Sequence, residues 1–213
     1  MMNCSKEECQ KTIEFRHACK TFCKKKIIDD EDIRFILDAG RMAPSSFGME
    51  GWKFLVVTNQ ELKEKLRPLC WNQAQITTCS HLVIILAAID ALRPSSGIPQ
   101  QRFARRRLPK EKEEAYIKLY SEFLSEEIAD DEKMFAWSAK QTYLAAMQMM
   151  LAAASIEIDS CPIEGFEREK VEELLGIDKK EYRISLLLPF GYRIYPQSGH
   201  IRRNFEEVVE FIE

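Results

Sequence analysis

Two pairs of cationic side chains, one near each end of the chain, have a spacing that could hold an anion. Arg16 and Lys20 are four residues apart at the end of an expected first helix, where this spacing places both on one face. His200 and Arg202 could form a second polar cluster of the same kind. An Arg fork matches a phosphate and a Lys supplies a point charge. The pattern therefore fits a phosphate cradle, although spacing alone fits an ordinary solvated face better.

A phosphorylated ligand would depend on such scattered cations, because the sequence holds neither a G-x-G-x-x-G fingerprint nor a P-loop. One loop could bring backbone close to a ligand. It runs from Cys161 to Phe166, with a rigid Pro162 and a permissive Gly165 after Glu164. The alternative is an ordinary turn before the next helix.

Other reactive residue types point to no site. The seven cysteines are an odd number with no compact disulfide pattern, so we expect reduced thiols in a cytoplasmic protein. The Cys4/Cys9 and Cys19/Cys23 spacings do not suit zinc, so we predict no metal. His81 heads an apolar run and is expected to be a core histidine. The Arg102–Arg107 run could bind nucleic acid, but the acidic residues that follow favour a solvated helix start.

The apolar patterns predict the elements that must position these residues. Helices are expected at 5–17, 29–42, 60–69, 72–79, 101–127, 131–156 and 167–175, with strands at 52–58, 81–89 and 183–192. Residues 158–163 form a short extended segment, 93–101 a loop, and 204–212 are helical or extended. Ser5 and Glu8 form a capping box, Pro44 stops the second helix, and Gly176 ends the 167–175 helix.

Composition and element order limit the class of protein. Helices and strands do not alternate regularly, which favours an α+β fold over a doubly wound sheet. With 213 residues, 46% hydrophobic, the chain suits one domain or two small ones. The formal net charge of -3 gives no argument for nucleic acid or acidic lipid. The N-terminus is too polar for a signal peptide, and no apolar run is long enough to span a membrane.

Four separated segments resemble, in order, the FMN-dependent nitroreductase family. They are Arg16-His17-Ala18-Cys19-Lys20, then Pro44-Ser45-Ser46 to Trp52, then Asn72-Gln73-Ala74-Gln75, then Pro162-Ile163-Glu164-Gly165. The tail His200-Ile201-Arg202 stands where the family usually has Lys-x-Arg. The resemblance implies a mixed, mostly antiparallel sheet surrounded by helices, in one domain spanning 1–213. It implies an intertwined homodimer with FMN at the interface. A variable helical insertion at about 93–130 would cover the substrate pocket.

The resemblance also implies residue roles. Arg16, His17, Ala18 and Lys20 match positions that hold the FMN phosphate, ribityl chain and pyrimidine edge, and Arg202 matches a C-terminal phosphate ligand. Asn72 matches a residue bonded to the isoalloxazine. Glu164 and Gly165, after Pro162, match the loop whose backbone N–H faces flavin N5. Pro44, Ser45 and Ser46 match a loop that reaches the partner's flavin. The implied cofactor-binding set is completed by Gln75 and His200.

The implied activity is reduction of nitroaromatics, quinones or free flavin by NADH or NADPH through a ping-pong hydride transfer, with Lys20 and Glu164 as catalytic residues. His200 replaces the usual Lys, and Gln75 stands where some members carry a nicotinamide-binding Lys, so the preferred nicotinamide stays open. Two alternatives remain. One keeps the fold for dehalogenation or flavin cleavage, and the other is a non-catalytic nucleic-acid-binding protein using Arg102–Arg107.

Overall fold

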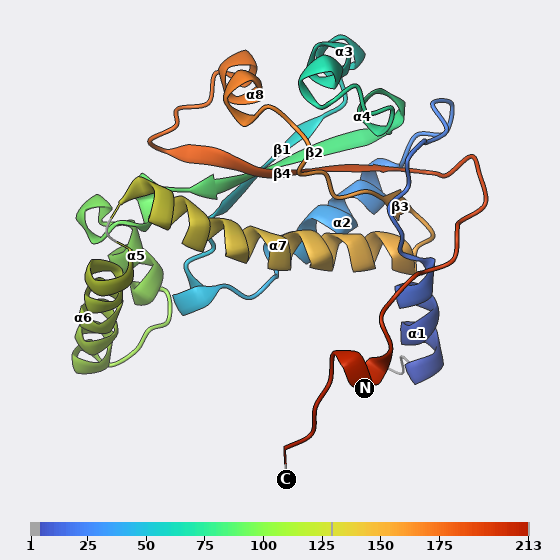
Figure 1. Ribbon diagram of the computed structural model, residues 1–213. Helices are drawn as coiled ribbons and strands as arrows, with labels where there is room; N and C mark the ends of the chain where they lie inside the picture. The colour runs from blue at the N-terminus through green and yellow to red at the C-terminus, as the bar shows by residue number, and fades with distance from the viewer. Residues whose placement is uncertain (1–4, 129, 213) are drawn as a thin grey trace.

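The computed structural model describes residues 5–128 and 130–212, and its centre is a four-stranded antiparallel sheet (Figure 1). In spatial order the strands are β1 (Trp52–Val57), β2 (His81–Ala88), β4 (Tyr182–Gly191) and β3 (Asp159–Ser160). Every residue of β2 is buried, as its continuous apolar sequence predicts for a central strand. β1 is an edge strand that pairs only with β2 among the described residues.

Eight α-helices surround this sheet in the described part of the chain, which confirms the α+β class. They are α1 (Lys6–Phe15), α2 (Asp30–Arg41), α3 (Gln60–Leu69), α4 (Gln75–Thr78), α5 (Ile98–Ala104), α6 (Lys110–Glu127), α7 (Asp131–Ser155) and α8 (Arg168–Leu175). Ser5 and Glu8 form the predicted capping box of α1, and Gly176 ends α8 in the left-handed conformation with φ 63°. None of the described helices is both long and apolar enough to cross a membrane.

The helices form a layer on each face of the sheet (Figure 1). On one face Leu82, Ile84 and Leu86 pack with Leu66 of α3 and Val171 of α8. On the other face, Val83 and Ile85 pack with residues of α2 and α7. Successive β2 side chains point to opposite faces, so one strand supplies two cores.

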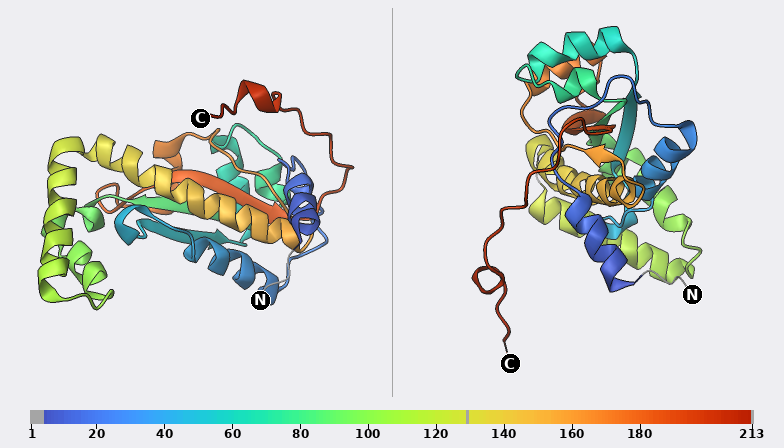
Figure 2. Two further views of the ribbon diagram at one scale, coloured as in Figure 1. Left: turned by 90° about the horizontal axis from the view of Figure 1, so that it is seen from below. Right: turned by 90° about the vertical axis from the view of Figure 1, so that its right-hand side faces the viewer.

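The α5–α6 pair lies beyond one end of the sheet and α1 beyond the other, with α7 running between them (Figure 1, Figure 2). A third core cluster joins the pair to the rest, with Phe103 of α5, Tyr120 of α6 and Trp137 of α7 among its buried members. The C-terminal tail leaves β4, passes α1 and extends away from the body (Figure 2). Its side chains Ile201, Phe211 and Ile212 are 92%, 79% and 93% exposed.

The prediction that Arg16 and Lys20 share a helical face is wrong. Helix α1 ends at Phe15, and Arg16 is already extended at φ -67° and ψ 118°. The reason is tertiary: Ala18 pairs with Ser160 in an isolated parallel bridge, and Cys19 N–H donates to the Ser160 carbonyl. The extended path carries Lys20 to the edge of the sheet instead of along a helix.

Three further boundaries differ from the sequence patterns. The expected 101–127 helix is two helices, because α5 ends at Ala104 and α6 begins after Pro109. The expected 93–101 loop already contains the start of α5. The 72–79 helix is only α4, since Trp71 and Asn72 both adopt left-handed backbone at φ 55° and 54°. The 204–212 segment holds one 3-10 turn, Phe205–Glu207.

Candidate functional site

Residues from both ends of the chain line one cavity of about 310 Å³, which we call the terminal cradle. It is lined by Arg16, His17 and Ala18 and by the tail segment Ser198–Arg202. Two tail residues hold the tail against the end of α1, because Gln197 Nε2 donates to the Glu14 carbonyl at 2.8 Å and His200 Nε2 lies 3.0 Å from it. The structure thus brings Arg16 of the first predicted cluster together with His200 and Arg202 of the second, whereas Lys20 does not line this cavity.

The cations of the terminal cradle keep free donors. Arg16 is half-buried, and its guanidinium has no hydrogen bond or ion pair among the described residues. Among the described residues, the Arg202 guanidinium hydrogen-bonds only with the carbonyl of Ile201 and with His200 Nδ1. A guanidinium carries five N–H donors, so both side chains can still bind an anionic oxygen. A half-buried arginine without a partner is what an anion-binding site would require.

An ion pair between Asp159 and Arg193, which the sequence did not indicate, lies next to His17 of the cradle. The Asp159 carboxylate forms an ion pair with Arg193 Nη2 at 2.7 Å and lies 3.5 Å from His17 Nδ1, and its Oδ1 accepts no hydrogen bond in the described chain. Burial lowers the pKa of His17 and the Arg193 charge lowers it further, so the imidazole is neutral at pH 7. A neutral ring can accept or donate one hydrogen bond toward a ligand.

His17, Cys19 and Asp159 also place three possible metal ligands within 4.8 Å of one another. The Asp159 carboxylate is already paired with Arg193, and burial raises the pKa of Cys19 to about 11, which keeps the thiol protonated. A protonated thiol beside a guanidinium is a poor cation ligand. The group therefore fits the wall of the cradle better than a metal centre.

Lys20 and Gln75 meet at a buried thiol next to the cradle. Lys20 Nζ lies 3.7 Å and Gln75 Nε2 3.9 Å from Cys161 Sγ. Gln75 also donates to Gln73 at 2.9 Å, and Gln73 donates to the Gly165 carbonyl at 2.8 Å. A continuous set of polar contacts therefore runs from Lys20 to the Glu164–Gly165 loop.

The Glu164–Gly165 loop is held by two aromatic residues that the sequence did not single out. Trp71, 69% exposed, lies against Gly165, where a Cβ would be 2.6 Å from the indole Cε3, so any larger residue at 165 would displace the indole. Tyr143 of α7 donates to the Glu164 carboxylate at 2.6 Å. The backbone N–H groups of Glu164 and Gly165 have no hydrogen-bond acceptor in the described chain, and Pro162 is exposed beside them. These amides could bind a ligand atom. Asn72, also exposed, lies next to Trp71.

The Pro44–Ser46 segment does not join this group. Ser46 N–H donates to Gln141 on α7 at 2.9 Å, whereas Tyr143 on the same helix faces Glu164. Two residues correspond to about 200° around a helix axis. The segment therefore lies across α7 from the Glu164 loop of its own chain.

The Arg102–Arg107 run is largely engaged inside the protein. Arg102 donates to the Met49 carbonyl, Arg105 pairs with Glu50 and Arg106 donates to the Phe47 carbonyl, while the Phe103 ring is buried. Nucleic-acid binding needs cations that face outward to phosphates. Three arginines of this run therefore bind residues 47–50 of the same chain, which removes the main support for the hypothesis of nucleic-acid binding.

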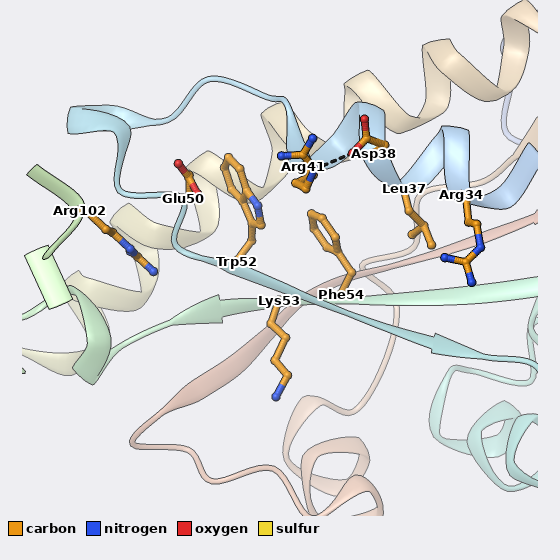
Figure 3. Close-up of a pocket in the computed structure, with 9 residues that line it drawn as sticks. All are labelled: Arg34, Leu37, Asp38, Arg41, Glu50, Trp52, Lys53, Phe54 and Arg102. Carbon is orange, nitrogen blue, oxygen red and sulfur yellow. Dashed lines mark hydrogen bonds and ion pairs between the residues drawn. The ribbon is translucent and has the colours of Figure 1, made fainter. Parts of the chain in front are cut away.

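A larger cavity, about 710 Å³, contains none of the residues expected to bind the cofactor, although Trp52 and Arg102 line it (Figure 3). It is an open groove between α2 and the edge strand β1, where the stacked rings of Trp52 and Phe54 lie near Arg34 and the Arg41–Asp38 ion pair (Figure 3). Size alone would select this groove, but its Arg34, unpaired among the described residues, is exposed, whereas the half-buried unpaired arginine and the neutral imidazole lie in the terminal cradle. We therefore take the cradle and the Lys20–Gly165 set as the candidate site.

Comparison with known proteins supplies the remaining findings. A sequence model described as "Nitroreductase family" matches residues 13–192. A Staphylococcus epidermidis protein named "Putative NAD(P)H nitroreductase" is 40% identical over 207 residues, covering 93% of this chain and 94% of that protein. A nitroreductase-like protein from Streptococcus mutans superposes with a TM-score of 0.88 at 20% identity, covering 98% of this chain and all of that one. A structure from Exiguobacterium sibiricum, solved "in complex with FMN", gives 0.81 at 22% identity, covering 95% and 96%.

Proposed function

The chain belongs to the nitroreductase family, and we propose that it is an FMN-dependent oxidoreductase that uses NAD(P)H to reduce a small-molecule acceptor. The relatives' NAD(P)H nitroreductase names and the FMN complex of a protein with the same fold support the two cofactors. One observation in this molecule carries the proposal: Arg16, half-buried and unpartnered in the described chain, faces His200 and Arg202 across a single cavity.

The terminal cradle fits the phosphate end of FMN. Arg16 and Arg202 would donate to phosphate oxygens, and His17 and the Ala18 backbone would contact the adjoining chain. His200 stands at the position of the usual Lys and would offer one imidazole N–H to a phosphate oxygen. The cradle volume of about 310 Å³ is at the small end of ligand pockets, which run from about 300 to 1,000 Å³, so it would hold only part of the cofactor.

The Lys20–Gly165 set fits the ring end. FMN held here would supply the two-electron redox chemistry between NAD(P)H and the acceptor. Lys20 would supply positive charge where negative charge develops, and the Glu164 or Gly165 amide would donate to the ring edge. Asn72 and Gln75 would contact the ring's polar edge. The Tyr143 hydroxyl fixes the Glu164 side chain, which keeps the loop amides in one orientation.

The site needs a second copy of the chain. Pro44, Ser45 and Ser46 lie across α7 from the Glu164 loop, so they could reach only the cofactor of a partner. Helix α7 exposes an apolar stripe, with Tyr143, Leu144 and Met147 between 40% and 46% exposed, and the tail exposes further apolar side chains. Such surfaces favour association. We therefore propose an intertwined homodimer with each FMN at the interface.

The acceptors would be nitroaromatics, quinones or free flavin, binding in turn with NAD(P)H over one ring face in a ping-pong sequence. The α5–α6 pair, within the insertion expected at about 93–130, would cover that face in a single nitroreductase-like domain. No described observation favours dehalogenation or flavin cleavage over this reaction. The six described cysteines are all free thiols, which supports a reducing, cytoplasmic setting; Cys4 lies outside the described residues.

Cofactor titration tests the proposal directly. Each charge-assisted bond to phosphate contributes about 1.5–3 kcal/mol, so Arg16→Ala and Arg202→Ala should each weaken FMN binding about tenfold or more. Quenching of flavin fluorescence measures the dissociation constant. Arg203→Ala is the matched control, since Arg203 is exposed and has no partner in the described chain. If the first two variants bind FMN as tightly as the control, the phosphate site is misplaced.

A further inference from the structure

The loop of residues 44–50 has a backbone that needs outside support. Phe47 and Glu50 adopt left-handed conformations at φ 55° and 46°, on either side of Gly48 at φ 65°. Residues with a Cβ are uncommon there and persist only where surrounding contacts hold them. The loop also carries Ser45 and Ser46, which the proposed dimer places on the partner's cofactor. What holds the loop therefore bears on the site.

Three arginines from one short stretch hold the loop from outside. Arg102 of α5 donates to the Met49 carbonyl, and Arg106, just after α5, donates to the Phe47 carbonyl. Arg105 forms a two-pronged contact with the Glu50 carboxylate, with Nη2 to Oε1 at 3.0 Å. Each arginine thus has a different acceptor on residues 47–50.

Aromatic packing joins the same two elements. The Phe47 ring meets Tyr120 of α6 edge-on at 5.1 Å and Phe123 at 5.6 Å. The Arg106 guanidinium lies over the Phe103 ring at 5.2 Å and the Tyr116 ring at 5.4 Å. The side chain that fastens the loop is therefore itself fixed by aromatic faces from α5 and α6.

The hold extends to Ser45 and Ser46. Ser45 Oγ accepts from the Glu50 amide at 2.8 Å, and the carbonyls of Ser45 and Ser46 accept from Gly48 and Met49 at 2.9 and 3.1 Å. Each of these bonds comes from an amide within residues 48–50, and the arginines bind the neighbouring Phe47 and Met49 carbonyls and the Glu50 carboxylate. A change in residues 47–50 would therefore change the geometry at Ser45 and Ser46.

We propose that Arg102, Arg105 and Arg106 are positioning residues that lock the α5–α6 pair to the 44–50 loop and thereby set the wall that each subunit presents to its partner's cofactor. This rests on the proposed function for the cofactor, but the lock itself is a property of one chain. None of the three touches the cofactor in this scheme. They act through the loop.

The test compares two adjacent arginines. Arg106→Gln removes the guanidinium that holds the Phe47 carbonyl, and Arg107→Gln is the control, because Arg107 is exposed with no side-chain partner in the described chain. Hydrogen exchange of the full-length protein, with and without FMN, reports on the peptide covering 44–50. We expect faster exchange there in Arg106→Gln only, and partial recovery in Arg106→Lys, which keeps a charged donor.

FMN titration supplies the second readout. Because Arg106→Gln loses one hydrogen bond that holds the loop, its FMN dissociation constant should rise about fivefold, whereas that of Arg107→Gln should not change. Unchanged exchange in Arg106→Gln would overturn the lock. Faster exchange with unaltered FMN affinity would overturn its positioning role. If the wild-type protein binds no FMN, the proposed function fails, while the exchange comparison still decides whether the lock exists.

Discussion

Two titratable side chains are buried next to each other at the start of β2 and take no part in the candidate site. Lys63, 2% exposed, donates to the carbonyls of Cys79 and Ser80 at 2.9 and 2.8 Å. His81, 7% exposed, lies 2.9 Å from Ser80 Oγ. Burial lowers the pKa of both side chains, and the charge of Lys63 lowers that of His81 further. His81 is therefore the satisfied core histidine that the sequence predicts, in its neutral form.

This neutral histidine should make stability depend on pH. The folded-state pKa of His81 lies below its ordinary value of 6.5, so the unfolded chain takes up the proton more readily. The free energy of unfolding should therefore fall as pH decreases below 6.5. Above pH 6.5 the contribution of His81 to the free energy of unfolding should stay constant. Urea unfolding on either side of that pH measures this. The fall should be smaller in His81→Gln than in the wild type, and undiminished in His200→Gln, whose ring is exposed. An equal fall in all three proteins would contradict the assignment.

At the scale of elements, the contact between α2 and α7 closes the core on the side of the sheet where Val83 and Ile85 of β2 lie. Gly40 is buried at the end of α2, and a Cβ there would lie 2.1 Å from Met149 Cε and 2.7 Å from its Cγ. The missing side chain lets α2 approach α7 closely enough for Ile36 and Met149 to share one cluster. This packing fixes the position of α7 relative to the sheet. It therefore also positions Gln141, which binds Ser46, and Tyr143, which binds Glu164.

Filling that contact should loosen the layer. Gly40→Leu adds a side chain where Met149 already lies, and overpacking of this kind costs about 1–3 kcal/mol. Chemical denaturation measures the loss. Arg34→Leu, an exposed position on the same helix with no partner in the described chain, should stay within about 0.5 kcal/mol of the wild type. Equal stability of the two variants would mean that α2 and α7 can separate freely.

The whole molecule has apolar surface at places far apart on one chain. It covers the outer stripe of α7 and the extended tail, where Ile201, Phe211 and Ile212 are 92%, 79% and 93% exposed. Contiguous exposed apolar surface on a single chain marks an association surface. The Pro44–Ser46 segment lies across α7 from the Glu164 loop of its own chain. Association with a second chain would therefore complete the site.

Sedimentation should therefore give about twice the 24.8 kDa chain mass at micromolar concentration. Met147→Glu places a charge on the α7 stripe and should shift the protein toward monomer with loss of bound FMN. Leu119→Glu is the matched control, because Leu119 is also an exposed apolar side chain, 52% against 40% for Met147, and lies on α6. A monodisperse monomer that still holds FMN and turns over would rule out the shared site.

The sequence by itself determined most of the local elements. The bounds of α3 follow its apolar period, β2 follows its continuous apolar run, and the end of α8 follows Gly176, because these features depend on neighbours in the chain. The family resemblance selected the stretches that line the candidate site. Neither source indicated Trp71, Tyr143 or the Asp159–Arg193 pair, since a Tyr on a helix or an Asp in a short strand has no local signature of a partner.

Tertiary structure alone decided how those stretches meet. Arg16 and Arg202 share a cavity because the tail returns past α1, and Lys20 meets Cys161 because the chain after α1 pairs with Ser160 instead of staying helical. The basic run binds residues 47–50, which come from a distant part of the chain. Local patterns record the conformation of neighbouring residues, whereas these contacts join residues dozens to nearly two hundred positions apart, and only the packed chain determines them.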